Sequence, residues 1–221
     1  MGERDVTVAA VMTAPRYECT QARTVIQKAL TKTGIPLTVS GGVYYHQCME
    51  KMLEDLCDQK IQYALTIDFD SVFLAEHITR LLSIVAQEDE IDALAAIQPM
   101  RNNGRVLGSL AEGGVMEWSG RPLQVDTAHF GLTVIDIQKL LTVRKPWFTF
   151  TPDEDGGWGT TSVDADVQFW RNWAEAGHKV FLDPGCRLGH LEEMVTVFDE
   201  KMIKQHLYYA DWEKLSESTI N

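Results

Sequence analysis

The first 97 residues alternate between short apolar runs and amphipathic segments, and this alternation restricts the fold more than any other feature. Apolar runs of strand length occupy residues 6–12, 35–40, 61–67 and 91–97. Between them, apolar residues recur at helical spacing in residues 20–33, 44–60 and 74–87. Strands that alternate with helices in this way form a mostly parallel sheet with helices on both faces. We therefore predict an α/β fold.

The chain changes character after about residue 97. Glycines become frequent, and the strand-like runs are short: GGVMEW (113–118), PLQVDTA (122–128) and GLTVID (131–136). A helical pattern returns in FWRNWAEAG (169–177), and we predict a further helical segment in the polar tail, 199–221. At 221 residues, the chain has the length of a single domain. We predict one domain (1–221) with a regular half, 1–97, an irregular half, 98–198, and a helical tail.

The net charge of −12 limits the partners of the protein. A surface of this charge repels nucleic acid phosphates and anionic lipids unless cations are concentrated locally. No apolar run approaches the ~20 residues that span a bilayer, and the charged N-terminus does not have the pattern of a signal peptide. We therefore expect a cytoplasmic protein without a membrane span. A nucleotide would also be repelled, unless a bound cation screened the site.

Two acidic residues end one of the buried runs. In YALTIDFDSVF (63–73), five apolar or small residues lead directly into Asp68 and, after one residue, Asp70. Ligands of open α/β sheets bind beyond the carboxyl ends of the strands. Carboxylates at that place suit a hard divalent cation that also accepts substrate phosphates. The alternative is that DFDS caps the following helix, since Asp and Ser are common N-caps. The pair of aspartates alone leaves both hypotheses open.

A second polar cluster lies near the end of the irregular half. Asp164 and Asp166 open a helical pattern that ends at Gly177, and His190 follows the next strand-like run. A single histidine can be a metal ligand or an ordinary core or surface residue. Cys186 and His190 do not predict a zinc site, because no second pair of ligands accompanies them.

Taken in order, these segments resemble the GT-A-fold glycosyltransferases, especially the family-2-like members of bacteria and phages. The resemblance covers most of the chain and rests on MTAPR (12–16), YALTIDFDSVF (63–73), HFGLTVIDIQKL (129–140) with KPWF (145–148), and VDADVQFWRNWAEAGHKVFLDPGCRLGH (163–190). It implies a nucleotide-binding half at 1–97 and an acceptor and catalytic half at 98–198. It also implies an inverting, metal-dependent transfer of a sugar from a nucleoside diphosphate sugar, with a UDP-sugar as the expected donor.

The resemblance assigns roles to particular residues. It places a Mn²⁺ or Mg²⁺ ion on Asp68, Asp70 and His190. It places the donor on Thr13, Pro15, Arg16, Gln47, Asp68 and Gly131. The general base falls on Asp166, and Asp164 is the alternative. The segment Pro146-Trp147-Phe148 would border the donor sugar and acceptor, with Trp147 itself in the core. The chain departs from the family pattern at His46-Gln47, where an Arg-Asn pair is usual, and at Ala165-Asp166, where a Glu-Asp pair is usual.

Two other functions stay open at this point. A nucleotidyltransferase also holds a metal and phosphates with paired carboxylates, but its expected glycine-rich basic loop is missing from MTAPRYE. A non-catalytic module that binds nucleotides or sugars could retain the same fold. The acceptor of a transferase is equally open: a saccharide, a protein, a small molecule or a modified phage DNA base. The sequence does not predict the oligomeric state.

Two remaining features are open to two interpretations each. The loop TPDEDGGWGTT (151–161) is either a mobile flap that stacks on a sugar or a surface loop whose tryptophan packs on the core. Arg101, Arg105 and Arg121 either meet a diphosphate or an anionic acceptor, or lie scattered on the solvated surface.

Overall fold

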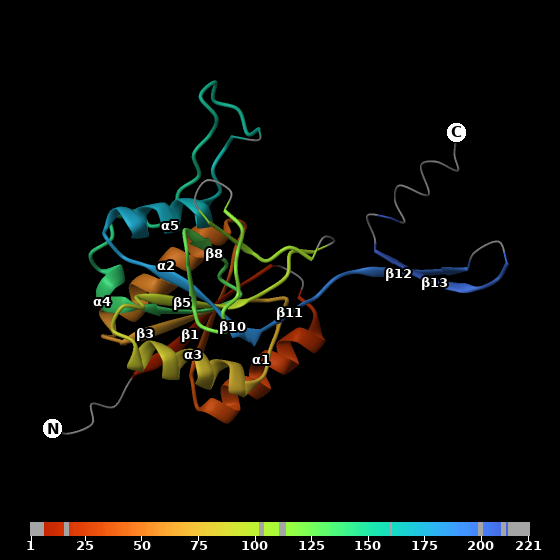
Figure 1. Cartoon of the computed structure of the whole chain (residues 1–221), viewed down its shortest axis with the longest axis horizontal. Helices are drawn as coiled ribbons and strands as arrows, with labels where there is room; N and C mark the ends of the chain where they lie inside the picture. Colours follow the sequence, from red (N-terminus) through yellow and green to blue (C-terminus); the bar gives the residue numbers. More distant parts are fainter. Residues whose placement is uncertain are drawn as a thin grey trace.

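The computed structural model describes residues 7–15, 18–101, 104–110, 114–159, 161–198, 201–208 and 211. A seven-stranded sheet forms the centre of this part of the chain, with the order β2-β1-β3-β9-β5-β10-β7 (Figure 1). In that order the strands are Leu37–Gly41, Val8–Ala14, Tyr63–Asp68, Leu132–Asp136, Ala93–Ile97, Val180–Arg187 and Leu123–Val125. All run in one direction except β9 and β7, which are antiparallel to their neighbours. The predicted mostly parallel α/β sheet is confirmed.

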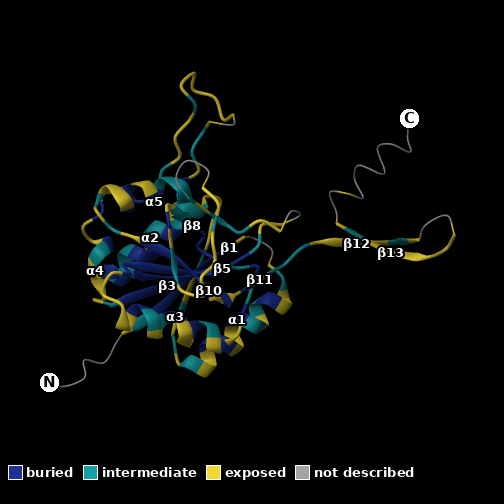
Figure 2. Cartoon of the chain, in the orientation of Figure 1, coloured by how far each residue is buried: buried dark blue, intermediate teal, exposed yellow. Residues whose placement is uncertain are grey.

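Helices cover both faces of the sheet, as predicted (Figure 1). On one face lie α1 (Thr20–Thr33) and α3 (Ala75–Gln87), whose buried residues pack on the sheet in one apolar cluster. On the other face lie α2 (Tyr45–Asp58), the single turn α4 (Ile137–Leu140) and α5 (Ala165–Glu175), in a second cluster. Figure 2 shows the buried strands between helices whose outer surfaces are exposed. One apolar layer on each face of the sheet therefore holds the ends of the strands in place.

An aromatic cluster anchors α5 to the sheet. Phe130 lies 5.1 Å from Phe169 and 5.3 Å from Trp170 between ring centroids, and Phe148 stacks on Phe169 at 4.8 Å. Trp147 is 1% exposed, which confirms its prediction as a core residue. Because aromatic side chains bury large areas and pack in preferred geometries, this cluster holds the first turn of α5 in a defined position.

The chain differs from the prediction at two places, one in the irregular half and one in the tail. Residues 122–128 and 131–136 supply β7, β8 (Thr127–Ala128) and β9, but residues 114–118 are not a strand. Val115 is 83% exposed there, so this run has no sheet face to bury. The predicted helical tail is wrong for residues 204–208, which form a strand, whereas Asp211 is helical. Instead of continuing a helix, β13 (Lys204–Tyr208) pairs antiparallel with β12 (Met194–Phe198).

The tail departs from helix for a local reason. The β-branched residues Val195, Thr196 and Val197 favour a strand. Each of them pairs with a residue of β13 in an antiparallel register. The resulting hairpin extends away from the sheet (Figure 1). Within the described residues, no helix is long and apolar enough to cross a membrane.

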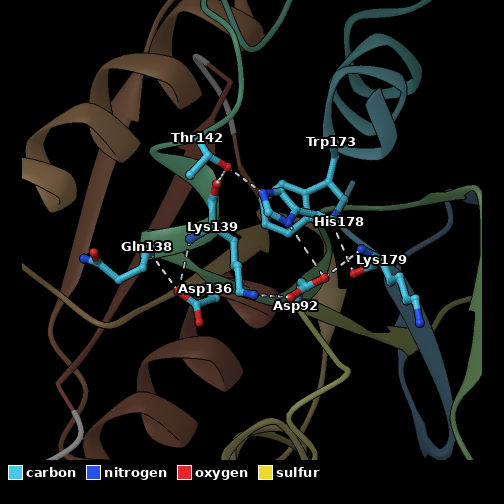
Figure 3. A network of polar contacts seen from close by, with 8 residues as sticks. All are labelled: Asp92, Asp136, Gln138, Lys139, Thr142, Trp173, His178 and Lys179. Carbon is cyan, nitrogen blue, oxygen red and sulfur yellow. Dashed lines mark hydrogen bonds and ion pairs between the residues drawn. The ribbon is translucent and has the colours of Figure 1, made fainter. Parts of the chain in front are cut away.

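A polar network ties together the edge of the sheet where β5 and β10 begin (Figure 3). Asp92 forms an ion pair with Lys139 Nζ at 3.0 Å and accepts a hydrogen bond from the Lys179 backbone N–H at 2.9 Å. His178 lies 3.9 Å from the same carboxylate and contacts the Thr142 hydroxyl at 2.6 Å. The buried carboxylate of Asp92 is therefore compensated from several directions.

Candidate active site

The candidate site lies at the opposite edge, where β3 ends. Asp68 is the last residue of β3 and stands in register with Thr13 on the neighbouring β1. The Asp68 N–H donates a hydrogen bond to the Gly131 carbonyl, N to O 3.3 Å. Three of the residues expected to bind the donor, Thr13, Asp68 and Gly131, thus lie at one edge of the sheet.

Gly131 lies where a side chain cannot fit. A Cβ atom at this position would lie 2.1 Å from Gln98 Oε1, 2.7 Å from His129 Nδ1 and 2.8 Å from Ser71 Oγ. His129 accepts a hydrogen bond from the Gly131 N–H at Nδ1 and contacts the Ala96 carbonyl through Nε2. Burial lowers the pKa of His129 to about 4, so its imidazole is neutral. The polar side chains packed around residue 131 form the base of the site, and they leave room only for glycine at this position.

Two very short strands bring Asp70 to His190. β4 (Ser71–Val72) pairs antiparallel with β11 (Gly189–His190), and His190 stands opposite Ser71. His190 Nε2 lies 3.3 Å from Asp70 Oδ2, and His190 Nδ1 lies 2.9 Å from the Pro99 carbonyl oxygen. Since a carbonyl can only accept, Nδ1 carries a proton, and in the neutral ring the lone pair is on Nε2.

Arg101 occupies the space between these two side chains. Its guanidinium contacts the Asp70 carboxylate and donates from Nε to His190 Nε2, N to N 3.1 Å. Arg101 is therefore an exposed surface residue, as one of the two interpretations has it, but it is paired with Asp70 and His190. The sequence gives only a weak indication of this contact. Arg101 follows β5 by four residues and therefore lies at the same edge of the sheet as Asp68.

Asp166 faces Asp68 from the first turn of α5. Burial and, after it, the charge of Asp166 raise the pKa of Asp68 to about 6, against the opposing charges of His190 and Arg101. Burial also raises the pKa of Asp166, and Asp164 adds to that shift. Tyr45, at the start of α2, has its pKa raised by burial and then by both aspartates, Asp68 and Asp166. The sequence analysis did not identify Tyr45, which carries no motif.

The helix-capping alternative fails for Asp68 and Asp70, whereas Asp164 does stand at a helix N-cap. The N-cap of α3 is Leu74, so neither Asp68 nor Asp70 caps that helix. Asp164 does occupy the N-cap position of α5, but its exposed side chain accepts no capping hydrogen bond. Asp166 is half-buried in the first turn of the same helix. The two aspartates of α5 therefore differ in burial and in what they face.

The remaining predicted donor ligands are less closely connected to the site. Pro15 is exposed just beyond β1, and Arg16 lies outside the described residues. Gln47 is exposed in the first turn of α2. Trp158 is 68% exposed, so the hypothesis that it packs on the core is wrong.

Asp70 and His190 are spaced so that one divalent cation could contact both. The buried Asp70 Oδ2 accepts no hydrogen bond of normal geometry, and its partner Nε2 carries a lone pair 3.3 Å away. Two ligands held about 2.0–2.2 Å from one cation lie about 3.0–3.4 Å apart at angles near or slightly above 90°. These two donors fit one ion. Within the described part of the chain, however, no three His, Cys, Asp or Glu side chains form a metal-binding group, so Asp68 is not placed as a third ligand.

Comparisons with known proteins support the fold. No family model matches the chain, and no curated protein matches it. The solved structure of A197 from STIV superposes with a TM-score of 0.61 at 12% identity over 89% of this chain and 92% of that one. The structure of GalNAc-T7 with UDP, GalNAc and Mn²⁺ superposes with a TM-score of 0.52 at 11% identity, covering 86% of this chain and 44% of that one. The chain has a GT-A-like glycosyltransferase fold.

Proposed function

We propose that this chain is a metal-dependent glycosyltransferase that moves a sugar from a UDP-sugar to an acceptor hydroxyl, with inversion. One observation carries the proposal: Asp68, Asp70, His190 and Asp166, from separate segments, gather at the carboxyl end of β3. In a GT-A-like sheet this edge is where a ligand binds. The neighbour GalNAc-T7, crystallised with UDP, GalNAc and Mn²⁺, supports the choice of ligands.

Asp70 and His190, with Asp68 beside them, would hold a Mn²⁺ or Mg²⁺ ion. A cation at this position would neutralise the diphosphate as it leaves the sugar. Few protein ligands are needed, because such ions usually keep waters and take phosphate oxygens as further ligands. Arg101 must first leave the space between Asp70 and His190, and its half-exposed side chain has solvent to move into.

Asp166 would take the proton of the acceptor hydroxyl. Its raised pKa makes the carboxylate a stronger base than an exposed aspartate, while its place in the first turn of α5 favours the charged form. It comes from α5, whereas Asp70 lies in the turn between β3 and β4 and His190 lies in β11. Base and cation site thus belong to different elements, as an attack opposite to the leaving diphosphate requires.

Thermal shift with nucleotide sugars tests this function. UDP-glucose, UDP-galactose, UDP-N-acetylglucosamine, UDP-N-acetylgalactosamine and GDP-mannose would each be added with manganese or with a chelator. We expect one UDP-sugar to raise the melting temperature only with manganese, because a ligand that binds the native state stabilises it by mass action.

Two variants make the result specific. Asp70→Asn removes the charge of one proposed ligand and should abolish the manganese-dependent shift. Asp89→Asn changes an exposed aspartate at the other edge of the sheet and should keep it. The proposal fails if no UDP-sugar shifts the wild type, or if Asp70→Asn responds like the wild type.

A further inference from the structure

Four aromatic side chains, three of them exposed and one (His46) half-buried, form a row beside the candidate site. Ring centroids are 5.8 Å apart between Tyr44 and His46, 4.8 Å between His46 and Phe150, and 6.1 Å between Phe150 and Trp158. Tyr44 is 58% exposed, Phe150 46% and Trp158 68%. We call these four residues the aromatic strip. Side chains of this size normally bury their rings, and a contiguous exposed set marks a surface that binds something.

The strip is continuous with the acid cluster. Tyr45, between two members of the strip, points the other way, toward Asp68 and Asp166, whose charges raise its pKa. Its ring also packs edge-on against Phe148, two residues before Phe150. The start of α2 and the segment that follows Trp147 therefore each turn one aromatic side chain inward, Tyr45 and the core residue Phe148, and place another on the strip. A molecule lying on the strip would have one end near Asp166.

The loop that carries Trp158 is held by its own hydrogen bonds. Asp153 accepts from the Gly159 N–H at 2.6 Å and from the Thr161 hydroxyl at 2.5 Å. Phe150 and Trp158 meet edge to face at 88°, and His46 and Phe150 at 89°. These contacts arrange the rings in advance of any ligand, which reduces the entropy lost on binding. Figure 2 shows the loop as an exposed projection beyond α5.

The chemistry of the strip favours a neutral, extended ligand. Four adjacent rings offer flat apolar surface over more length than one sugar covers. The loop adds Asp153, Glu154 and Asp155, and residues 149–159 contain no lysine or arginine. These carboxylates, with a net charge of −12, repel phosphates. Nucleic acid bases also stack on aromatic rings, but such sites run along a positively charged groove.

We propose that the aromatic strip binds a neutral oligosaccharide, which is the acceptor of the transfer reaction. This inference rests on the proposed function, and it selects the saccharide among the possible acceptors. The sugar rings stack along Trp158, Phe150, His46 and Tyr44. The terminal hydroxyl then reaches the carboxylate of Asp166.

Binding to an array of immobilised glycans tests the strip without requiring turnover. The array would carry neutral oligosaccharides of hexoses, N-acetylhexosamines and deoxyhexoses, phosphorylated glycans and single-stranded oligonucleotides. We expect the wild type to retain at least one neutral glycan. Trp158→Ala and Phe150→Ala should each weaken that binding by about fivefold or more, because anchoring aromatic residues dominate binding surfaces.

A matched control lies on the hairpin formed by β12 and β13. Phe198 is 64% exposed but belongs to β12, which extends away from the sheet (Figure 1). Phe198→Ala should leave glycan binding unchanged. Because all three positions are exposed, the melting temperature of each variant should stay close to that of the wild type.

The outcomes separate the strip from the proposed function. The strip proposal is overturned if no neutral glycan is retained, if both strip variants bind like the wild type, or if oligonucleotides bind through these same rings. Metal-dependent hydrolysis of a UDP-sugar is measured in parallel. Hydrolysis without glycan binding overturns only the strip, whereas glycan binding without hydrolysis of any donor overturns the transferase and leaves a saccharide-binding module.

Discussion

Aspartates lie at both edges of the central sheet, and their surroundings differ. Where β5 and β10 begin, Asp92 is compensated by Lys139 and by the Lys179 N–H, with His178 close by (Figure 3). Where β3 ends, Asp68 faces the like charge of Asp166, and Asp70 is paired with the half-exposed Arg101 and with His190. The first edge uses its carboxylate to hold the fold together. The second places two acidic side chains against each other, and a pKa shift caused by burial and by a like charge is typical of a functional site.

The largest effect should come from the base. Asp166→Asn keeps the size of the side chain but removes the proton acceptor, so turnover should fall by about 10²–10⁴-fold. Asp164→Asn should cost less than about threefold, because this side chain is exposed and Asn suits an N-cap. Steady-state kinetics on an identified acceptor measures both. Full activity of Asp166→Asn, or loss of activity only in Asp164→Asn, would show that the roles are assigned wrongly.

A substitution at the opposite edge should lower the stability of the protein. Asp92→Ala leaves the Lys179 N–H and the Lys139 ammonium without their buried acceptor, so the free energy of unfolding should fall by about 1–3 kcal/mol. Urea unfolding followed by circular dichroism measures this difference. UDP-sugar binding by the folded variant should be unchanged. If Asp92→Ala is as stable as the wild type but no longer binds the donor, the assignment of a stabilising role to Asp92 is wrong.

The site edge should show the reverse effect on stability, with a defined pH dependence. Because the pKa of Asp68 is raised to about 6 in the folded protein from an ordinary 3.8, the folded state binds more protons than the unfolded state between these values. Stability contributed by this group is therefore lost as the pH rises through that window. Asp68→Asn should raise the free energy of unfolding at pH 7.5, in a chelator, by up to about 3 kcal/mol.

Lowering the pH checks that explanation. At pH 4 the wild-type Asp68 is protonated in the folded state, so Asp68→Asn should bring almost no gain there. Unfolding curves of both proteins at the two pH values give the comparison. An equal gain at both values would assign the effect to packing and not to charge.

Much of the site was predictable because it follows from local patterns. The apolar run 63–67 ends at Asp68, and strand ends at one edge of a parallel sheet meet, so Asp68 and Gly131 come together as the sequence indicates. The contacts of Arg101 were not predictable. They join residues 89 positions apart through β4 and β11, strands of two residues each, which leave no periodic pattern. The helix predicted after 199 fails at residues 204–208 because these residues pair with β12, a contact that the polar pattern of the tail does not indicate.

The most direct test of the account is the position of a manganese ion. Crystals grown with manganese and UDP would be measured near the manganese absorption edge, where the anomalous signal locates the ion. The account predicts a peak about 2.0–2.2 Å from Asp70 and from His190 Nε2, with Arg101 displaced from between them. An ion more than about 6 Å from His190, well beyond any first-shell distance, or no ion at the end of β3, would contradict it.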